Sequence, residues 1–258
     1  MSNEKILKPI TYWSSLFYFG IPSMVITVFI YYLWPYLNRI GTPAIVSFAF
    51  IMYVPLASLL VASLLGFLIE GNKMTWANLK NRFRLKPMKK REWLWTIGLI
   101  IFAIISYGGL SFTAKWLASI QIFSPPDFLP PIVDPRVEQI MIPKEFMGIL
   151  LKGKWWIVLG YLGGLFLNIF GEEFWWRGYI LPRQEVVMGK HTWIIHGILW
   201  TLFHVFWKWN LIMLLPVSLS ISFVSSKLKN TWPAIIAHFA LNGVGVIPLI
   251  LGVLGSNS

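Results

Sequence analysis

"FGEEFWWRGYILPR", residues 170–183, places two adjacent carboxylates and an arginine in a stretch that is otherwise apolar and aromatic. A charge at the centre of a membrane helix costs about 2.5–3.5 kcal/mol on insertion scales, so charged groups found there usually serve a function. Glu172, Glu173 and Arg177 are therefore the first candidate site residues. Whether they lie in a membrane depends on the rest of the chain.

The composition is that of a membrane protein. Of the 258 residues, 57% are hydrophobic and 12% are charged, which is far more apolar than a soluble domain. The net charge of +12 would suggest nucleic acid on a soluble surface, but the basic residues cluster between apolar runs, so we expect membrane lipid and no nucleic acid as the partner. The absence of cysteine excludes disulfides, thiolate metal sites and a cysteine nucleophile.

Apolar segments long enough to cross a bilayer recur along the whole chain. About 20 apolar residues, rising about 1.5 Å each, span a hydrocarbon core about 30 Å thick. The sequence therefore predicts an all-α, polytopic transmembrane helical bundle of about seven to eight membrane helices, with a conical or water-filled cavity. We expect residues 1–258 to form a single integral membrane domain whose motif-bearing core covers about 155–253. The predicted spans are 14–34, 44–69, 93–118, 155–181, 192–207, 211–226 and 232–253.

The basic residues indicate an orientation in the cell membrane. With these spans, fourteen Lys and Arg residues, including Lys5, fall on the side of the N-terminus and seven fall on the other. Basic loops stay in the cytoplasm, so the N-terminus is predicted to be cytoplasmic and the C-terminus external. The external loop 119–153 contains "SPPDFLPPIVDP", whose prolines prevent a continuous helix. It is interpreted equally well as a lid or as a simple connector.

Two histidines and an asparagine lie in other predicted spans. His204 occurs in "ILWTLFHVFW", and His238 lies four residues before Asn242 in "IIAHFALNG", which puts these two on one helix face. Glu173 and Arg177 share a face in the same way, whereas Glu172 points about 100° away.

Several roles remain open for these residues. The two glutamates could exchange roles. Glu172, Glu173 and Arg177 could also simply hold the bundle together. We expect His196 and His191 to be packing and loop residues.

The pattern indicates water activation rather than a covalent mechanism. The sequence has no G-x-S-x-G and no H-E-x-x-H. A buried carboxylate can take a proton from water while histidine and asparagine stabilise the oxyanion that forms. A zinc ion held by Glu172, His204 and His238 is a chemical alternative, since carboxylate and imidazole both bind zinc.

These residues resemble the motifs of the CAAX prenyl protease and bacteriocin-processing (CPBP or Abi) family of intramembrane proteases. "EEFWWR" matches the family's E-E-x-x-x-R, and "HFALN" matches H-x-x-x-N. "WTLFH" matches F-x-x-x-H except that Trp200 stands where the family normally has Phe. The three motifs occur in the expected order over about residues 165–245, and the first 150 residues carry no motif.

The resemblance implies roles for individual residues. Glu172 and His204 would activate water, His238 and Asn242 would stabilise the oxyanion, and Glu173 and Arg177 would support the site. It also implies a glutamate-dependent mechanism without a required cofactor, with zinc as the alternative.

The implied activity is an intramembrane endopeptidase acting near the inner face on a membrane-associated or lipidated peptide. Peptide maturation, CAAX-type processing and bacteriocin-related processing or immunity all remain open. The alternatives from other classes are a proton-coupled transporter and a non-catalytic membrane scaffold. The sequence leaves the oligomeric state open.

Overall fold

Helices make up almost the whole structure, as predicted. The computed structural model describes residues 7–138 and 141–255. Its long helices are α1 (Tyr12–Val28), α3 (Ala44–Ile69), α5 (Lys90–Gly109), α7 (Trp155–Glu173), α9 (Thr192–Phe203), α10 (Leu211–Leu228), α11 (Trp232–Asn242) and α12 (Val246–Leu254). Shorter pieces are α2 (Trp34–Arg39), α4 (Trp76–Arg82), α6 (Phe112–Ala118), α8 (Leu181–Met188), the π-helices η1 (Phe29–Leu33) and η4 (Phe174–Ile180), and the 3-10 segments η2 (Gln121–Phe123), η3 (Pro131–Val133), η5 (Gly189–His191), η6 (His204–Asn210) and η7 (Gly243–Gly245).

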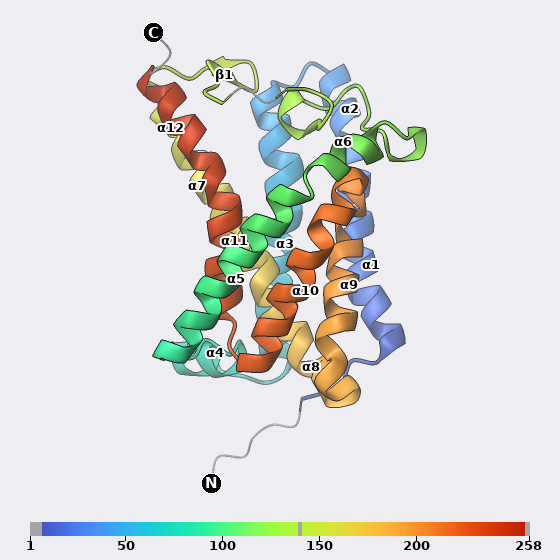
Figure 1. The fold of residues 1–258 in the computed structure, drawn as a ribbon, viewed down its shortest axis with the longest axis vertical. Helices are drawn as coiled ribbons and strands as arrows, with labels where there is room; N and C mark the ends of the chain where they lie inside the picture. The colour runs from blue at the N-terminus through green and yellow to red at the C-terminus, as the bar shows by residue number, and fades with distance from the viewer. Residues whose placement is uncertain (1–6, 139–140, 256–258) are drawn as a thin grey trace.

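Five helical stretches of the described chain are long and apolar enough to cross a membrane, which confirms the polytopic bundle. One of them, Trp155–Leu228, folds back on itself because it contains α7, α9 and α10; α9 and α10 run side by side in Figure 1, and α7 lies beside α12. The other four are Tyr12–Arg39, Ala44–Ile69, Lys90–Gly109 and Trp232–Leu254.

Three of the differences between the observed helix boundaries and the predicted spans have a clear local cause. The predicted span 93–118 is broken after Gly109, where two glycines end α5 and α6 begins. The first stretch continues to Arg39 because the π-helix η1 joins α1 to α2 without interruption. The predicted span 192–207 ends as an α-helix at Phe203, since η6 turns into a 3-10 segment with a kink at Trp207.

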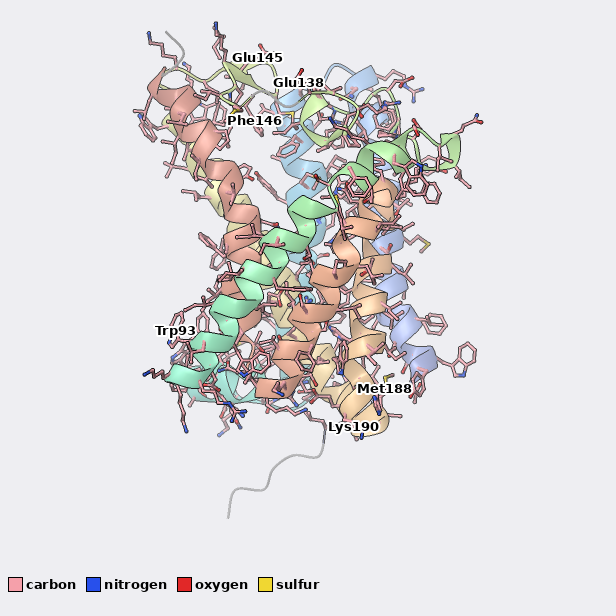
Figure 2. All side chains as sticks on the ribbon, viewed as in Figure 1. Trp93, Glu138, Glu145, Phe146, Met188 and Lys190 are labelled. Carbon is pink, nitrogen blue, oxygen red and sulfur yellow. The ribbon has the colours of Figure 1, made fainter. Side chains whose placement is uncertain are left out.

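The two ends of the bundle differ in composition, and we name them for that difference. The basic end carries α4, α8 and the connection between α10 and α11 (Figure 1). The cap end carries α2, α6 and the described part of the 119–153 segment, which we call the cap. Figure 2 shows Lys190 at the basic end and Glu138 and Glu145 at the cap end.

The cap contains no long helix in its described part, as its prolines predicted. It consists of η2, η3 and a hairpin of two short antiparallel strands, β1 (Glu145–Phe146) and β2 (Ile149–Leu150). Leu129 belongs to the main buried core, and Phe146 packs edge to face on Phe48 of α3 at a centroid distance of 5.4 Å. The cap is thus held against the bundle by apolar side chains.

A glycine sets the close approach of α7 to α3 just before the paired glutamates. A Cβ atom on Gly171 would collide with the backbone carbonyl of Leu56. Small residues allow helix backbones to approach closely inside membranes. The end of α7 that carries Glu172 is therefore fixed against α3.

Candidate active site

Glu172 lies in the last turn of α7, next to a change of helix type. The α-helix ends at Glu173 and the π-helix η4 follows at once. Such widened turns occur often at functional sites because they redirect side chains without breaking the helix. Glu172 is 3% exposed and lines a cavity of about 470 Å³.

Both carboxylate oxygens of Glu172 accept a hydrogen bond. Asn168 donates through Nδ2 to Oε1 at 2.8 Å, from the preceding turn of the same helix. Trp200 of α9 donates through its indole Nε1 to Oε2 at 2.7 Å. These two donors fix the carboxylate in one orientation at the cavity wall.

His204 faces the same carboxylate across a short gap. Its Nδ1 lies 2.8 Å from the carbonyl oxygen of Trp200, which can only accept, so Nδ1 carries the proton and Nε2 is an acceptor. Nε2 lies 3.9 Å from Oε2 of Glu172, which is too long for a direct hydrogen bond. A water molecule about 2.8 Å from each atom can contact both. His204 lies within an apolar helical stretch, as predicted, but it follows the last residue of α9 and begins the 3-10 segment η6.

His238 and Asn242 of α11 complete a chain of hydrogen bonds between two helices. His238 Nδ1 lies 2.9 Å from Oε1 of Glu173, and its Nε2 lies 3.0 Å from Nδ2 of Asn242. The same Asn242 nitrogen donates to Oδ1 of Asn168 at 2.8 Å. His238, Asn242 and Asn168 therefore tie α11 to both glutamates of α7.

Glu173 and Arg177 lie behind the cavity wall. Arg177 Nη1 donates to Oε1 of Glu173 at 3.2 Å, and both side chains are almost completely buried. The Arg177 guanidinium also stacks on the Trp200 ring, 3.6 Å from its centroid, in a cation–π contact. Glu172 lines the cavity and Glu173 does not, so the geometry separates two carboxylates whose roles the sequence left open.

The other two histidines lie outside this cluster. His196 is fully buried, with Nδ1 at 2.6 Å from Oε1 of Gln184, which in turn donates to Ser15 of α1. His191 is exposed at the end of η5. Neither residue lines the cavity.

Two contacts of Glu172 escaped the sequence reasoning. Asn168 stands four residues before Glu172, and this N-x-x-x-E spacing could have indicated a shared face. In the sequence, Trp200 stands out only as the residue that replaces the Phe normal in the motif. Its indole N–H, which Phe lacks, gave no signal of its partner because that partner lies on another helix.

The residues proposed for zinc do not converge as a ligand set. Among the described residues, no group of three or more His, Asp and Glu side chains is placed to hold a metal ion. Both ring nitrogens of His238 and both oxygens of Glu172 already have hydrogen-bond partners. The protein atoms as arranged do not fit Glu172, His204 and His238 as zinc ligands.

The cap contributes to the cavity directly. Val133 of η3 lines the cavity together with Tyr53, Tyr107, Tyr161 and Trp207. Beside Val133, Asp134 accepts a hydrogen bond from Arg136 at 2.7 Å, and that hydrogen bond lowers the pKa of Asp134 below its ordinary value. This ion pair closes a compact turn directly after the cap residue that lines the cavity.

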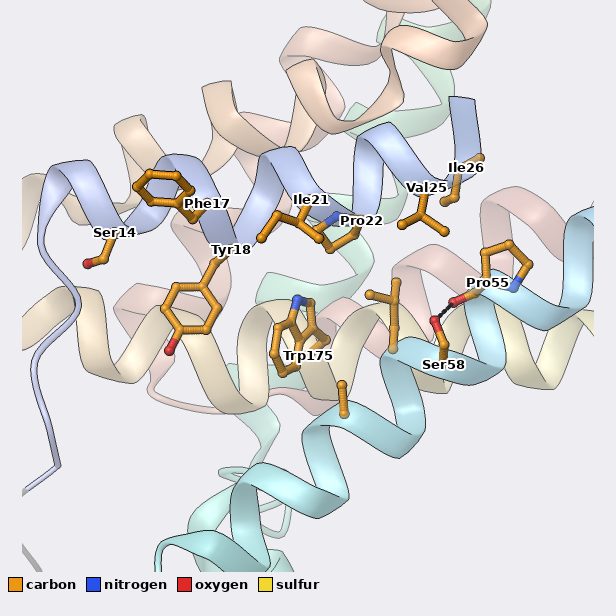
Figure 3. A pocket seen from close by; sticks show the side chains of 12 residues that line it. Ser14, Phe17, Tyr18, Ile21, Pro22, Val25, Ile26, Pro55, Ser58 and Trp175 are labelled. Atoms are coloured by element: carbon orange, nitrogen blue, oxygen red, sulfur yellow. Dashed lines mark hydrogen bonds between the residues drawn. The ribbon is translucent and has the colours of Figure 1, made fainter. Parts of the chain in front are cut away.

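A second cavity of about 530 Å³ lies between α1 and α3, with Trp175 of η4 at its floor (Figure 3). Its lining is almost entirely apolar, and Phe17 and Ile21 beside it are more than half exposed. Ile26 borders both cavities.

Comparison with known proteins bears on the segment that carries the cluster. Residues 154–244 match the model of the family described as Type II CAAX prenyl endopeptidase Rce1-like. No curated protein and no solved structure matches the chain. The matched segment runs from the start of α7 to the end of α11 and contains all six candidate residues. It supports a membrane-integral CAAX-type protease in general.

Proposed function

We propose that this chain hydrolyses a peptide bond of a membrane-associated or lipidated peptide with water activated by Glu172 and His204. The match of residues 154–244 to the CAAX endopeptidase family supports this proposal. The observation that carries the proposal is the 3.9 Å gap between Oε2 of Glu172 and Nε2 of His204 at the cavity wall. Both atoms are acceptors, so one water placed there directs its two protons at them. Its oxygen lone pair is then free to attack.

The reaction follows from these positions. The water oxygen bonds to the carbonyl carbon of the peptide while a proton moves to the Glu172 carboxylate, and the carbonyl oxygen becomes an oxyanion. The proton then passes to the amide nitrogen, the C–N bond breaks and an acid and an amine are released. No step requires a covalent enzyme intermediate, a cofactor or a metal ion.

The oxyanion is assigned to His238 and Asn242. Asn242 donates its Nδ2 protons to Asn168 and to His238 Nε2 in the structure, so the oxyanion must take over one of these two bonds. Glu173 accepts the hydrogen bond from His238 Nδ1 and so fixes the tautomer whose Nε2 faces Asn242, and Arg177 balances the charge of Glu173. Glu173 and Arg177 act in this proposal through His238 and Trp200.

The test is hydrolysis by the purified protein in detergent or liposomes. Fluorogenic and lipidated peptides are offered to the wild-type protein and to the Glu172→Gln and His204→Ala variants. Loss of hydrolysis in both variants supports the proposal, and unaltered hydrolysis in either contradicts it. A proton-coupled transporter would instead show pH-driven flux without cleavage. Activity that is lost with EDTA or phenanthroline and restored by zinc would replace the metal-free mechanism with the zinc alternative.

A further inference from the structure

The catalytic cavity extends from Glu172, in the last turn of α7, toward one end of the bundle, the cap end. Phe48 and Tyr53 come from the part of α3 near its start, Tyr161 comes from the part of α7 near its start, and Tyr107 stands two residues before the end of α5. These helix ends are the ones next to α2, α6 and the cap in Figure 1. No described residue of α4, α8 or the α10–α11 connection lines the cavity.

The basic residues concentrate at the opposite end. Figure 2 shows Lys190 at this end. Lys8 and Arg183 lie next to each other, because Arg183 donates through Nε to the carbonyl oxygen of Lys8. Lys5 lies outside the described residues. The other basic residues of the basic end are Lys73, Lys80, Arg82, Arg84, Lys86, Lys89, Lys90, Arg91, Lys227 and Lys229.

The cap end has a more balanced charge. Its basic residues are Arg39, Lys115, Arg136, Lys144, Lys152, Lys154 and Lys208, and its acidic residues are Asp127, Asp134, Glu138 and Glu145. Short loops rich in Lys and Arg stay on the cytoplasmic side during membrane insertion. The cap is well below the length, about 60 residues, at which this rule weakens.

Resting on the proposed function, we infer that the active site opens away from the cytoplasm and serves peptides that reach the membrane from the outer side. The position of the site within the fold and the position of the basic loops are independent observations, and together they reverse the expectation of cleavage near the inner face. Substrates are then exported or extracellular peptides rather than cytoplasmic chain ends.

The lining indicates which part of such a peptide enters. Glu172 is the single carboxylate among the described lining residues, and none of them is Lys or Arg. The phenol groups of Tyr53, Tyr107 and Tyr161 and the indole of Trp207 make up much of the wall near the cap. The residues on either side of the cleaved bond are therefore apolar or uncharged, because a charged side chain would lose water without gaining a partner.

The experiment uses the absence of cysteine in the natural chain. Val133→Cys at the cavity and Lys190→Cys at the basic end are made separately and labelled with a membrane-impermeant maleimide in right-side-out and inverted vesicles. The inference expects Val133→Cys to react in right-side-out vesicles and Lys190→Cys in inverted ones. The reverse pattern overturns it.

Hydrolysis in the same vesicles separates the side of the membrane from the activity. A membrane-impermeant, uncharged peptide should be cut by right-side-out vesicles and not by sealed inverted ones, and cleavage confined to inverted vesicles overturns the inference. If vesicles of neither orientation cut the peptide and the detergent-solubilised protein does not cut it either, the proposed function is contradicted. The labelling result alone then decides the orientation.

Discussion

Two buried histidine clusters occupy neighbouring parts of this bundle, and they differ in what surrounds them. His204 and His238 border a cavity of about 470 Å³ and lie beside carboxylates. His196 lies in a sealed network with the neutral side chains of Gln184 and Ser15 and borders no cavity. All three histidines look alike in sequence, each within an apolar, aromatic stretch.

The difference shows which structural features allow a buried histidine to transfer a proton. A histidine that bonds a neutral amide in a packed interior satisfies a polar group and stabilises one arrangement of helices. A histidine that shares a solvent-sized gap with a carboxylate can move a proton. Space and a charged partner, rather than the histidine itself, distinguish the two clusters.

The strongest test of the comparison is Glu172→Gln. The amide keeps the size of the side chain but cannot take a proton from water, so kcat should fall by about 10²–10⁴-fold. Peptide hydrolysis by the purified variant measures this. Its thermal unfolding should stay close to that of the wild-type protein, and a variant that retains more than half of its activity would remove Glu172 from the mechanism.

Trp200→Phe tests the indole hydrogen bond to Glu172. The substitution restores the aromatic residue normal for the motif but removes a donor to a charged group, a bond worth about 1.5–3 kcal/mol, so kcat should fall by about 10- to 100-fold with a smaller change in KM.

The matched control for Trp200→Phe is Trp176→Phe. Trp176 is equally buried, packs on Phe19, and its Nε1 has no hydrogen-bond partner among the described residues. The kcat of the Trp176→Phe variant should equal that of the wild-type protein. Equal losses in the two variants would mean that packing, and not the bond to Glu172, explains the effect.

His196→Leu addresses the sealed cluster. It leaves Oε1 of Gln184 without its partner in a buried place, which costs about 1–3 kcal/mol, so the variant should unfold at a lower temperature while kcat per folded molecule stays the same. Thermal denaturation and active-site-normalised hydrolysis measure the two quantities. A fall in kcat with unchanged stability would place His196 in the catalytic cluster after all.

The sequence predicted the bundle and the pairs of residues that share one helix face, because both depend on patterns within single helices. Apolar length defines a span, and a spacing of four places Glu173 with Arg177 and His238 with Asn242. The rotation of one helix against another is not encoded in such patterns. For that reason the contacts of Trp200 with Glu172 and of Asn242 with Asn168 came from the structure.

Helix ends were predicted less well than helix cores, for a physical reason. The π-helix η4 and the 3-10 segment η6 have the same apolar composition as the α-helices they extend, so hydropathy does not separate them. The change at Phe203 matters most, since the 3-10 segment begins there with His204, whose Nε2 lies 3.9 Å from Glu172 of α7. The side on which the cavity opens also required the fold, because it depends on which helix ends surround the site.

The smallest expected effect concerns the cap over the active cavity, where Asp134 and Arg136 form an ion pair that the buried histidine network lacks. The hydrogen bond from Arg136 lowers the pKa of Asp134 below its ordinary value of 3.8, so the pair stabilises the cap at neutral pH and this contribution is lost as the pH falls through the lowered pKa. Asp134→Asn should remove this pH-dependent contribution to the stability of the cap.

Since Arg136 is partly exposed, the effect of Asp134→Asn at neutral pH should be small. The rate at which a maleimide reaches Val133→Cys should rise by no more than about fivefold, the equivalent of at most about 1 kcal/mol. Asp127→Asn, whose side chain is 99% exposed and lies 3.5 Å from Arg136, is the control and should leave the labelling rate unchanged. If both substitutions speed labelling equally, the Asp134–Arg136 pair does not hold the cap closed.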